Sequence, residues 1–540
     1  MGDDSAPASR ATPERTAPLA RVYAFIQREA LATGFPLRAM VAASAVAHIA
    51  VLLLAVNPLH PDEHFQILEF AYARAGLAST GALPWEYAAQ IRPSLQPALA
   101  MIPLLLLRAL GLTSPFLWTF VLKAATLILA AAVTLLVLAH ATPTLSRPGK
   151  RALWLTSLFL WFQPLVQFRF TSENLGGLLL AAAIPFVVRL VAEEDSRNQS
   201  MAAGLLLGLS FVFRFQMAFA IVGLLAWVVL KSRGGWRPAA GLCMSMAVVV
   251  AAATLVDRWF YGQWVFTPWN YFRVNLLEGV ASTFGTEPWY WYLAGLPLWM
   301  APPLGVVLTL AFLVPLFRRP TNVWVWPAAA FFLGHTIIGH KELRFLLPLI
   351  YVAPVLLALA ADAVPERLFQ RGWVRWTLKA LAVQNMAILL LGMTPAPHRA
   401  AGFDTHFYHF LWDRAERSSG APVHVLSDGG NTFSTGIHYV LSLATYRHPS
   451  MVEVAYPPGA DVATLVPADT PASRLLLLWN RDEPPELAGA VVERLVYRAE
   501  PGYMPLVRLM GLEGSPVELR LRRVVNWESY RTVWEVRITQ

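Results

Sequence analysis

The sequence contains a single cysteine, Cys243, among 540 residues, and it lies inside an apolar stretch. An intramolecular disulfide is therefore excluded, and cysteine usage does not indicate a redox compartment. Charged residues are also scarce, at 14% of the chain, whereas hydrophobic residues make up 56%. Soluble domains carry nearly twice that share of charge, about 25%. This balance excludes an ordinary soluble globular enzyme.

Most hydrophobic residues fall in consecutive blocks between Ala39 and Met393. An apolar block of about 20 residues crosses a bilayer as a helix, because lipid offers its backbone no hydrogen-bond partners. The sequence thus predicts a polytopic α-helical membrane protein. The expected blocks are 39–56, 98–111, 115–140, 152–169, 174–192, 201–213, 217–230, 238–256, 291–316, 322–339, 343–361 and 374–393.

The distribution of basic residues predicts the orientation of these helices. The formal charge of +9 is mostly arginine in short loops, which is typical of a topology signal and not of a nucleic-acid-binding patch. Arginines before the first block place residues 1–38 in the cytoplasm and the loop 57–97 outside. If blocks 98–111 and 115–140 both crossed, the basic loop after them would lie outside. We therefore expect one of them to dip without crossing, which gives about eleven spans.

Residues 396–540 have a different pattern. Apolar runs shorten to strand length and alternate with turn signals, which predicts a small α/β domain, expected on the outer side. Residues 39–395 then form the transmembrane domain. The expected strands are 423–426, 475–479, 491–496, 517–524 and 532–538.

Two adjacent carboxylates, Asp62 and Glu63, lie in the first external loop. Carboxylates at a membrane edge are costly unless they have a partner or a function. Neighbouring residues point to different faces of a regular element, so we expect one to act as a general base while the other pairs with an arginine. The alternative is that both pair with loop arginines such as Arg92.

A second polar cluster, at residues 339–345, follows an apolar block. Lys341 and Arg344 are three residues apart and would share a face of a helix. Together with His340 they would form a cationic pocket suited to a phosphate. The alternative is a positively flanked helix end, but the cluster falls on the side opposite the other basic loops.

Two further stretches combine polar and aromatic residues. The external loop 257–290 places aromatic rings beside Asn and Glu, which suits a sugar. The residues alone favour an aromatic belt at the membrane interface there. Arg169 and Glu173 have the spacing of an i,i+4 ion pair at a helix end, with a structural or a functional role.

Four of these stretches occur together in one order. The first-loop residues are His60-Pro61-Asp62-Glu63-His64-Phe65-Gln66, Pro84-Trp85-Glu86-Tyr87 and Ile91-Arg92; the later ones are 257–262, 267–270, 285–292 and 340–345. Over roughly residues 40–395 this arrangement resembles glycosyltransferase family 22. That family includes the mannosyltransferases of glycosylphosphatidylinositol (GPI) anchor assembly and of lipid-linked N-glycan precursors.

The resemblance implies a GT-C membrane fold and an inverting transfer of mannose. The donor would be a polyprenyl-phosphate mannose, and the acceptor a hydroxyl of a lipid-linked glycan or glycolipid on the non-cytoplasmic face. Asp62 would be the catalytic base, with Glu63 orienting or substituting for it. The donor phosphate would be held by His340, Lys341, Arg344 and Arg92. The other expected substrate-binding residues are His60, Trp85, Glu86, Arg169, Glu173, Asp257, Asn270, Glu287, Trp289 and Tyr290.

The leaving group of such a donor is already good, so the resemblance implies no metal and no cofactor. Residues 425–432 depart from the Cys-His segment of the eukaryotic anchor enzymes, which leaves the acceptor open. The excess of arginine over lysine suggests a bacterial inner-membrane protein whose site faces the periplasm or exterior.

Two rival functions remain open. The same fold could use another polyprenyl-phosphate sugar, such as a hexose or an arabinose. A transporter would line a substrate path with intramembrane charges and would show paired half-sequences. We find no internal repeat, and the charges cluster at the ends of blocks, which favours an active site at the membrane surface.

Overall fold

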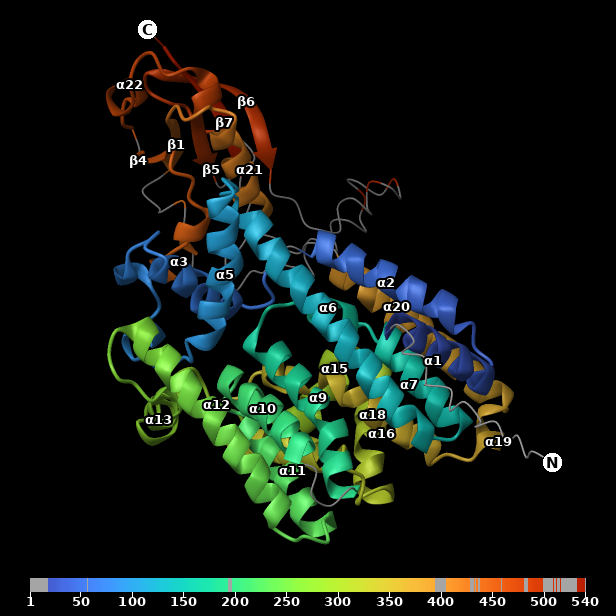
Figure 1. Ribbon diagram of the computed structural model, residues 1–540. Coiled ribbons are helices and arrows are strands. Elements are labelled where there is room, and N and C mark those ends of the chain that lie inside the picture. Colours follow the sequence, from blue (N-terminus) through green and yellow to red (C-terminus); the bar gives the residue numbers. More distant parts are fainter. Residues whose placement is uncertain are drawn as a thin grey trace, which may run out of the picture.

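The computed structural model describes residues 18–55, 57–192, 197–393, 405–427, 438–457, 459–479, 484–498 and 532–539, with 432, 434–435, 508, 511 and 515 between them. A helical body forms the larger part, and a sheet domain built from the C-terminal quarter of the chain lies against one end of it (Figure 1).

Every predicted apolar block is helical in the structure. Three of them are broken, at 160–161, at 300–303 and at Val352. Proline removes a backbone donor from a helix, and Pro302 and Pro303 lie in the second break. The helices of the body are α1 (Pro18–Thr33), α2 (Leu37–Leu54), η1 (His64–Glu69), α3 (Phe70–Arg74), η2 (Thr80–Ala82), α4 (Trp85–Ala88), α5 (Leu95–Ala109), α6 (Pro115–Ala141), η3 (Thr142–Thr144), α7 (Arg147–Phe159), α8 (Phe162–Val166), α9 (Ser172–Ala192), α10 (Arg197–Phe213), α11 (Met217–Lys231), α12 (Arg237–Tyr261), α13 (Thr267–Phe272), η4 (Arg273–Leu277), α14 (Val280–Thr283), α15 (Trp291–Trp299), α16 (Leu304–Arg318), α17 (Val325–Ile337), η5 (Leu343–Tyr351), α18 (Ala353–Asp362), α19 (Glu366–Phe369) and α20 (Gly372–Met393).

The long apolar helices confirm a multi-helix membrane protein. Among the described residues, five helices have the length and composition to cross a bilayer: α2, α6 with η3, α9, α12 and α20. A sixth span results if η5 and α18, which meet at an angle of 67°, are counted together. Helices α5, α11, α16 and α17 are apolar but shorter. The expected total of about eleven spans stays a prediction.

Helix α9 is the most buried of these spans, with 67% of its most apolar 18-residue stretch inside the protein. Glycine allows the neighbouring backbone to approach: a Cβ built on Gly177 would lie 2.2 Å from the carbonyl oxygen of Pro348 in η5. A Cβ built on Gly176 would lie 3.1 Å from Cγ of Met217 at the start of α11. This packing brings the first residues of α9 next to η5 and to the α10–α11 junction.

The C-terminal domain contains a five-stranded mixed sheet in the order β4-β1-β5-β7-β6. Strand β1 is parallel to β4 and β5, whereas β7 is antiparallel to β5 and β6. Its described elements are α21 (Thr405–Glu416), β1 (Val423–Ser427), β2 (Ser434–Thr435), β3 (His438–Ser442), η6 (Ala444–Tyr446), β4 (Met451–Ala455), α22 (Val462–Leu465), η7 (Ala472–Arg474), β5 (Leu475–Trp479), β6 (Ala490–Arg498) and β7 (Thr532–Ile538).

Four of the five predicted strands are confirmed as β1, β5, β6 and β7, and the fifth, 517–524, lies outside the described residues. The prediction missed β2, β3 and β4. In β4, Glu453 interrupts the apolar run, and at this edge of the sheet only Met451 of its five residues is buried.

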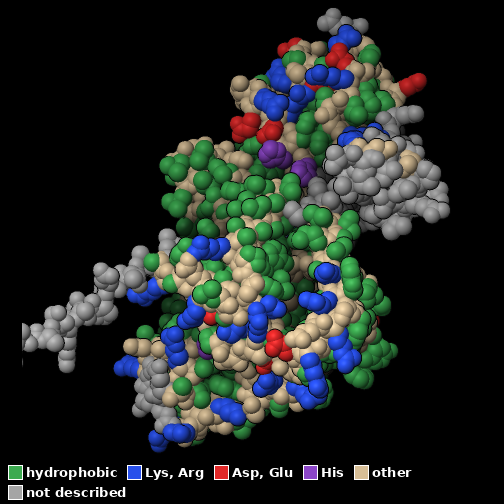
Figure 2. All heavy atoms as spheres, turned by 90° about the vertical axis from the view of Figure 1, so that its right-hand side faces the viewer, with side chains coloured by type: hydrophobic (Ala, Val, Ile, Leu, Met, Phe, Trp, Pro, Cys, Tyr) green, Lys and Arg blue, Asp and Glu red, His purple; other side chains and the backbone are tan. Residues whose placement is uncertain are grey.

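The sheet domain packs directly on the first external loop. Phe65 is buried in the same apolar cluster as Phe407, Tyr408 and Leu411 of α21. The side-chain oxygen of Asn57 accepts a hydrogen bond from the Thr405 amide at 2.9 Å. On the face seen in Figure 2, hydrophobic side chains form a band between this domain and a lower region rich in Lys and Arg. The sheet domain therefore fixes one side of the loop that carries the two carboxylates.

Candidate active site

A cavity of about 1270 Å³ lies where the first external loop meets the ends of several helices. Its walls come from segments that the sequence placed on one side of the membrane: the first loop, the start of α9, the α10–α11 junction, η4 and its neighbours, and the loop before η5. Four arginines and five carboxylates line it: Arg92, Arg169, Arg214, Arg344, Asp62, Glu63, Glu86, Glu173 and Glu342.

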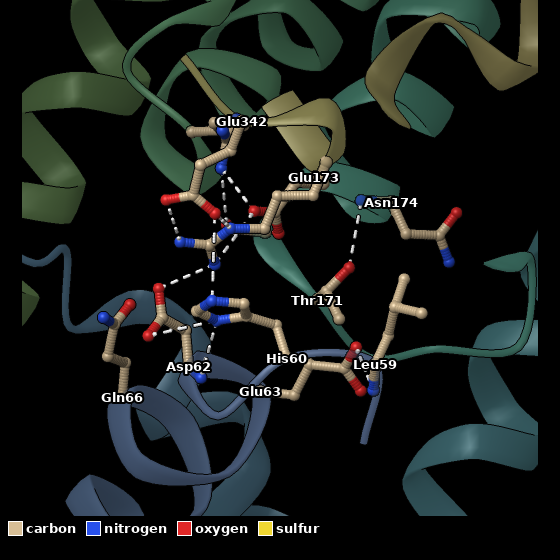
Figure 3. Close-up of polar contacts among 12 residues, drawn as sticks. Leu59, His60, Asp62, Glu63, Gln66, Thr171, Glu173, Asn174 and Glu342 are labelled. Carbon is tan, nitrogen blue, oxygen red and sulfur yellow. Dashed lines mark hydrogen bonds and ion pairs between the residues drawn. The ribbon is translucent and has the colours of Figure 1, made fainter. Parts of the chain in front are cut away.

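Asp62 lies at the centre of a group of charged side chains in this cavity. Its Oδ2 accepts a hydrogen bond from Arg344 Nη1 at 2.7 Å, and Arg92 Nη2 is 4.0 Å away. His60 lies between Asp62 and Glu342, with its Nδ1 3.4 Å from Asp62 Oδ1 and its Nε2 3.8 Å from Glu342 Oε2 (Figure 3). The side chain of Asp62 remains 28% exposed toward the cavity, so a substrate can reach it.

The surrounding charges decide the ionisation of Asp62. Burial alone would raise the pKa of its carboxyl, but Arg344, His60 and Arg92 outweigh burial and hold that pKa well below its usual range. Glu342 behaves in the same way. Burial raises its pKa, and the contacts with Arg344 and His60 lower it by more. Both groups are therefore carboxylates at neutral pH.

Glu63 points away from Asp62 and has different partners (Figure 3). Its Oε2 accepts a hydrogen bond from Arg169 Nη1 at 3.0 Å, and its Oε1 accepts one from the Leu59 amide at 3.0 Å. Arg169 also donates to the carbonyl of Asn57. The adjacent carboxylates thus face different partners, as the sequence predicted, and Glu63 ties the loop back on itself.

The expected pair of Arg169 and Glu173 is wrong. Residues 167–171 lie between α8 and α9 and are not helical, so i,i+4 spacing does not bring the two side chains together. Arg169 pairs with Glu63 instead. Glu173 Oε1 pairs with Arg214 Nη1 at 2.7 Å and is 3.9 Å from Arg344 Nη1.

The expected helix face shared by Lys341 and Arg344 is also wrong. Lys341 lies in the non-helical segment between α17 and η5, and it is 95% buried. Its ammonium donates to the backbone carbonyls of Glu287, Ile338 and Gly339 and does not line the cavity. Burial lowers the pKa of Lys341, which the nearby Glu287 only partly offsets.

Arg344 does line the cavity, but its donors are occupied. Its Nε and Nη2 bind the two oxygens of Glu342, at 2.6 and 3.1 Å, and its Nη1 binds Asp62. His340 also lines the cavity and lies 3.1 Å from Glu342 Oε1, while its other ring nitrogen is 2.9 Å from the Gly285 carbonyl. The cluster is thus an ion-paired network and not an open cationic pocket.

Other predicted substrate-binding residues divide into two groups. His60, Trp85, Glu86, Arg92, Arg169 and Glu173 line the cavity, whereas Asp257, Asn270, Glu287, Trp289 and Tyr290 do not.

Two residues of the second group have structural partners instead. Asp257 is buried and accepts hydrogen bonds from the Ser94 amide and hydroxyl and from Thr267. Asn270 donates to the Gln90 carbonyl. Trp289 and Tyr290 are exposed, as an interfacial belt would be.

One wall of the cavity is aromatic and acidic. Trp85 stacks on Phe284, with ring centroids 6.4 Å apart. Beside it, Glu86 accepts a hydrogen bond from Gln66 at 3.0 Å and lies 3.5 Å from Arg92 Nη2. Flat rings beside fixed polar groups match the apolar face and hydroxyls of a sugar.

Sequence reasoning missed Arg214 and His335, which both line the cavity. Arg214 directly follows α10 and is 95% buried. Its Nε and Nη2 have no hydrogen-bond partner among the described residues, and neither does Nε2 of His335. A single arginine between two apolar blocks was the available signal for Arg214. Within the same described residues, no group of three His, Cys, Asp or Glu side chains could hold a metal.

A multi-pass membrane protein with a charged cavity beside its first external loop has the features of an integral-membrane transferase. Residues 40–404 match the model of the Alg9-like mannosyltransferase family. The chain belongs to this family, and it is an enzyme of the polyprenyl-phosphate-mannose-dependent mannosyltransferase class. The resemblance and the enzyme class predicted from the four motifs are thereby confirmed.

Similar proteins include eukaryotic GPI mannosyltransferases. The chain is 23% identical to GPI alpha-1,2-mannosyltransferase 3 of Bos taurus, over 72% of this chain and 70% of that protein. It is 30% identical to GPI mannosyltransferase 3 of Yarrowia lipolytica, over 64% of this chain and 66% of that one. The match to the Mus musculus protein covers 52% of its length. The chain thus spans from about half to 70% of the length of these three relatives.

Solved structures with a similar arrangement of helices are more distant. ArnT from Cupriavidus metallidurans bound to undecaprenyl phosphate has a TM-score of 0.46 and 14% identity, over 81% of this chain and 92% of that one. The Archaeoglobus fulgidus oligosaccharyltransferase has a TM-score of 0.42 and 12% identity, over 81% and 67%.

Proposed function

We propose that the protein transfers mannose from a polyprenyl-phosphate mannose donor to a hydroxyl of a lipid-linked glycan or glycolipid, with inversion at the anomeric carbon. Family membership supports the donor class. The observation that carries the proposal is the position of Asp62, a carboxylate held ionised by Arg344 at the open centre of a cavity large enough for a sugar. No metal or cofactor takes part in the proposed reaction.

In this reaction Asp62 removes the proton from the acceptor hydroxyl. An electron pair of the acceptor oxygen forms the new bond to the anomeric carbon, from the face opposite the phosphate. The bond between that carbon and the phosphate oxygen breaks, and its electrons leave with the polyprenyl phosphate. A carboxylate with a strongly lowered pKa is a weak base. The proton therefore moves late, once bond formation has made the attacking hydroxyl acidic.

Glu63 and Lys341 have supporting roles in this proposal. Glu63 is bound to Arg169 and to the Leu59 amide, so it holds the loop that presents Asp62. Lys341 binds three carbonyls around Gly339, so it fixes the loop that precedes Arg344. Neither is free to take part in proton transfer or to contact a phosphate. These contacts support Asp62, and not Glu63, as the proposed base.

The test is mannose transfer in membranes that lack the wild-type protein and are supplied with labelled polyprenyl-phosphate mannose. Loss of a general base costs about 10²–10⁴-fold in rate, and we expect this for Asp62→Asn. Glu63→Gln should keep partial activity. Asp362→Asn is the matched control, because Asp362 pairs with Arg319 away from the cavity.

Two results would overturn parts of the proposal. If Asp62→Asn transfers mannose like the wild type, the cavity is not the active site. If the wild type transfers no mannose but does transfer another polyprenyl-linked hexose or pentose, the site stands and the sugar is wrong.

We also propose that the helices form a GT-C arrangement of about eleven spans in a bacterial inner membrane. The cavity and residues 396–540 would face the periplasm. The excess of arginine and the basic loops remote from the cavity support this orientation. A membrane-impermeant maleimide tests it in a Cys243→Ser background. Arg417→Cys in the sheet domain should react in intact cells, whereas Arg233→Cys after α11 should react only after lysis; the reverse pattern would refute it.

A further inference from the structure

A second hollow, of about 520 Å³, lies on the side of the helical body. It is an almost entirely apolar groove between α11 and α12, and Phe211 of α10 and Phe266 also line it. The lining residues are Phe211, Ala218, Ile221, Val222, Leu225, Cys243, Met246, Ala247, Val250, Ala251, Thr254 and Phe266. Helix α12 is a candidate membrane span, so such a groove is exposed to lipid chains and not to water.

The groove and the charged cavity share part of their walls. Phe211 of α10 and Ala218 of α11 line both. Between these two residues the chain turns from α10 into α11, and Arg214 lies in that turn. A molecule with an apolar tail and an anionic head can therefore lie with its tail in the groove and its head in the cavity, and Arg214 is the cation at the junction.

Arg214 also has hydrogen-bonding capacity that the protein leaves unused. Its Nη1 binds Glu173 Oε1 at 2.7 Å, and its flat face lies over Phe345, with Cζ 5.3 Å from the ring centroid. Its Nε and Nη2 are buried and have no hydrogen-bond partner among the described residues. Buried donors without an acceptor are costly and rare, so they indicate a ligand that supplies the acceptors.

The arginine expected to bind the phosphate is already engaged. All three nitrogens of the Arg344 guanidinium bind Asp62 or Glu342. A phosphate at Arg344 would have to displace two carboxylates and would approach their charge. At Arg214 the Nε and Nη2 donors are buried and have no partner among the described residues, and they lie side by side on one edge of the guanidinium, which matches two phosphate oxygens.

We infer that Arg214 binds the phosphate of the polyprenyl-phosphate donor and that the groove between α11 and α12 holds the first isoprene units of its tail. This inference rests on the proposed function for the identity of the donor. It assigns Arg344 a different role, which is to orient Asp62. The donor would then enter sideways from the bilayer between α11 and α12.

The experiment measures equilibrium binding of undecaprenyl phosphate and of undecaprenol to the purified full-length protein in nanodiscs. The ratio of the two affinities isolates the contribution of the phosphate. We expect Arg214→Gln to lower the affinity for undecaprenyl phosphate about 10- to 100-fold, which is the range for a lost charge-assisted hydrogen bond. The affinity for undecaprenol should not change. Arg214→Lys keeps a cation beside Glu173 but loses the paired donors, so its effect should be intermediate.

A groove variant and a control complete the design. Ala247→Trp fills the groove and should lower the affinity for both lipids about tenfold. This is the effect expected when about two methylene groups of the tail lose their burial. The control is Arg258→Gln, near the C-terminal end of α12, where the exposed Arg258 lies over Trp264. It removes a cation outside the groove and should change neither affinity.

The outcomes separate this inference from the proposed function. If the wild type transfers mannose but Arg214→Gln and Arg214→Lys bind undecaprenyl phosphate as the wild type does, the phosphate lies elsewhere. The inference about Arg214 is then wrong, and the proposed function stands. If no mannose is transferred yet the phosphate-dependent affinity requires Arg214, the prenyl-phosphate site stands and the sugar assignment falls. If inorganic phosphate at millimolar concentration displaces undecaprenyl phosphate and Ala247→Trp has no effect, the site binds a free phosphate and the groove assignment is wrong.

Discussion

Replacing Arg344 with glutamine should change the pH dependence of transfer as well as its rate. Arg344 Nη1 lies 2.7 Å from Asp62 Oδ2, and only 17% of the arginine side chain is exposed, so solvent screens the pair weakly. An opposite charge at such a distance lowers a carboxyl pKa by about 1–3 units. In Arg344→Gln this effect is lost while the burial that raises the pKa of Asp62 remains, so that pKa rises toward its ordinary value, although His60 and Arg92 still lower it.

The sign of the expected shift follows from the proposed role of Asp62 as a base. Transfer requires the ionised carboxylate and is lost as the pH falls through the pKa of Asp62. In the wild type that pKa is well below its usual range, so kcat/KM should stay level down to the acid limit of the protein's stability. In Arg344→Gln the acid limb should move to higher pH by about 1–3 units.

The assay is a pH profile of kcat/KM for mannose transfer, and it needs two controls. Arg169→Gln removes an arginine that pairs with Glu63 and not with Asp62, so it should leave the acid limb in place. Glu342 also loses its partner in Arg344→Gln, and adding Glu342→Gln separates its titration from that of Asp62. If Arg344→Gln lowers the rate equally at every pH, Arg344 acts on the leaving group and not through Asp62, and the reasoning is refuted.

Two further predictions concern the packing that holds the cavity together. Glu69→Ala removes the acceptor shared by His64 and the Thr445 amide, and it should destabilise the docked sheet domain by about 1–3 kcal/mol, read as a lower midpoint of thermal unfolding; an unchanged midpoint would show that this contact does not hold the domain. Gly177→Ala would place a Cβ 2.2 Å from the Pro348 carbonyl oxygen, so η5 must shift. We expect about 1–3 kcal/mol lower stability and reduced transfer, and a fully active, equally stable variant would contradict it.

The elements that the sequence predicted well are those with a strong local signal. Long apolar blocks became helices because their length and composition leave few alternatives in lipid. The motif at 60–66 and the motif at 340–345 could be assigned to one site because both follow blocks that end on the same side. Strand β4 was missed because Glu453 interrupts its short apolar run at the sheet edge and only Met451 of its five residues is buried.

The partners of the charged residues could not be read from spacing. Arg169 pairs with Glu63, which is 106 positions away, and not with Glu173, four positions away. Lys341 donates to backbone carbonyls and does not share a helix face with Arg344, because its segment is not helical. Such pairings depend on how α8, α9 and η5 pack, and one sequence does not specify that packing. Arg214 stood out only when the structure showed which of its donors lacked acceptors.

The charges in the cavity limit how an anionic donor can bind. The four arginines that line it face five carboxylates, so the cavity has no excess of positive charge for a phosphate. Affinity must then come from individual donors that are not already used, and from burial of the apolar tail. The same pairing keeps Asp62 ionised and fixed in place before any substrate arrives. In the proposed arrangement, Arg344 orients the base and Arg214 binds the leaving group, so the protein can bind an anion without withdrawing the cation that orients Asp62.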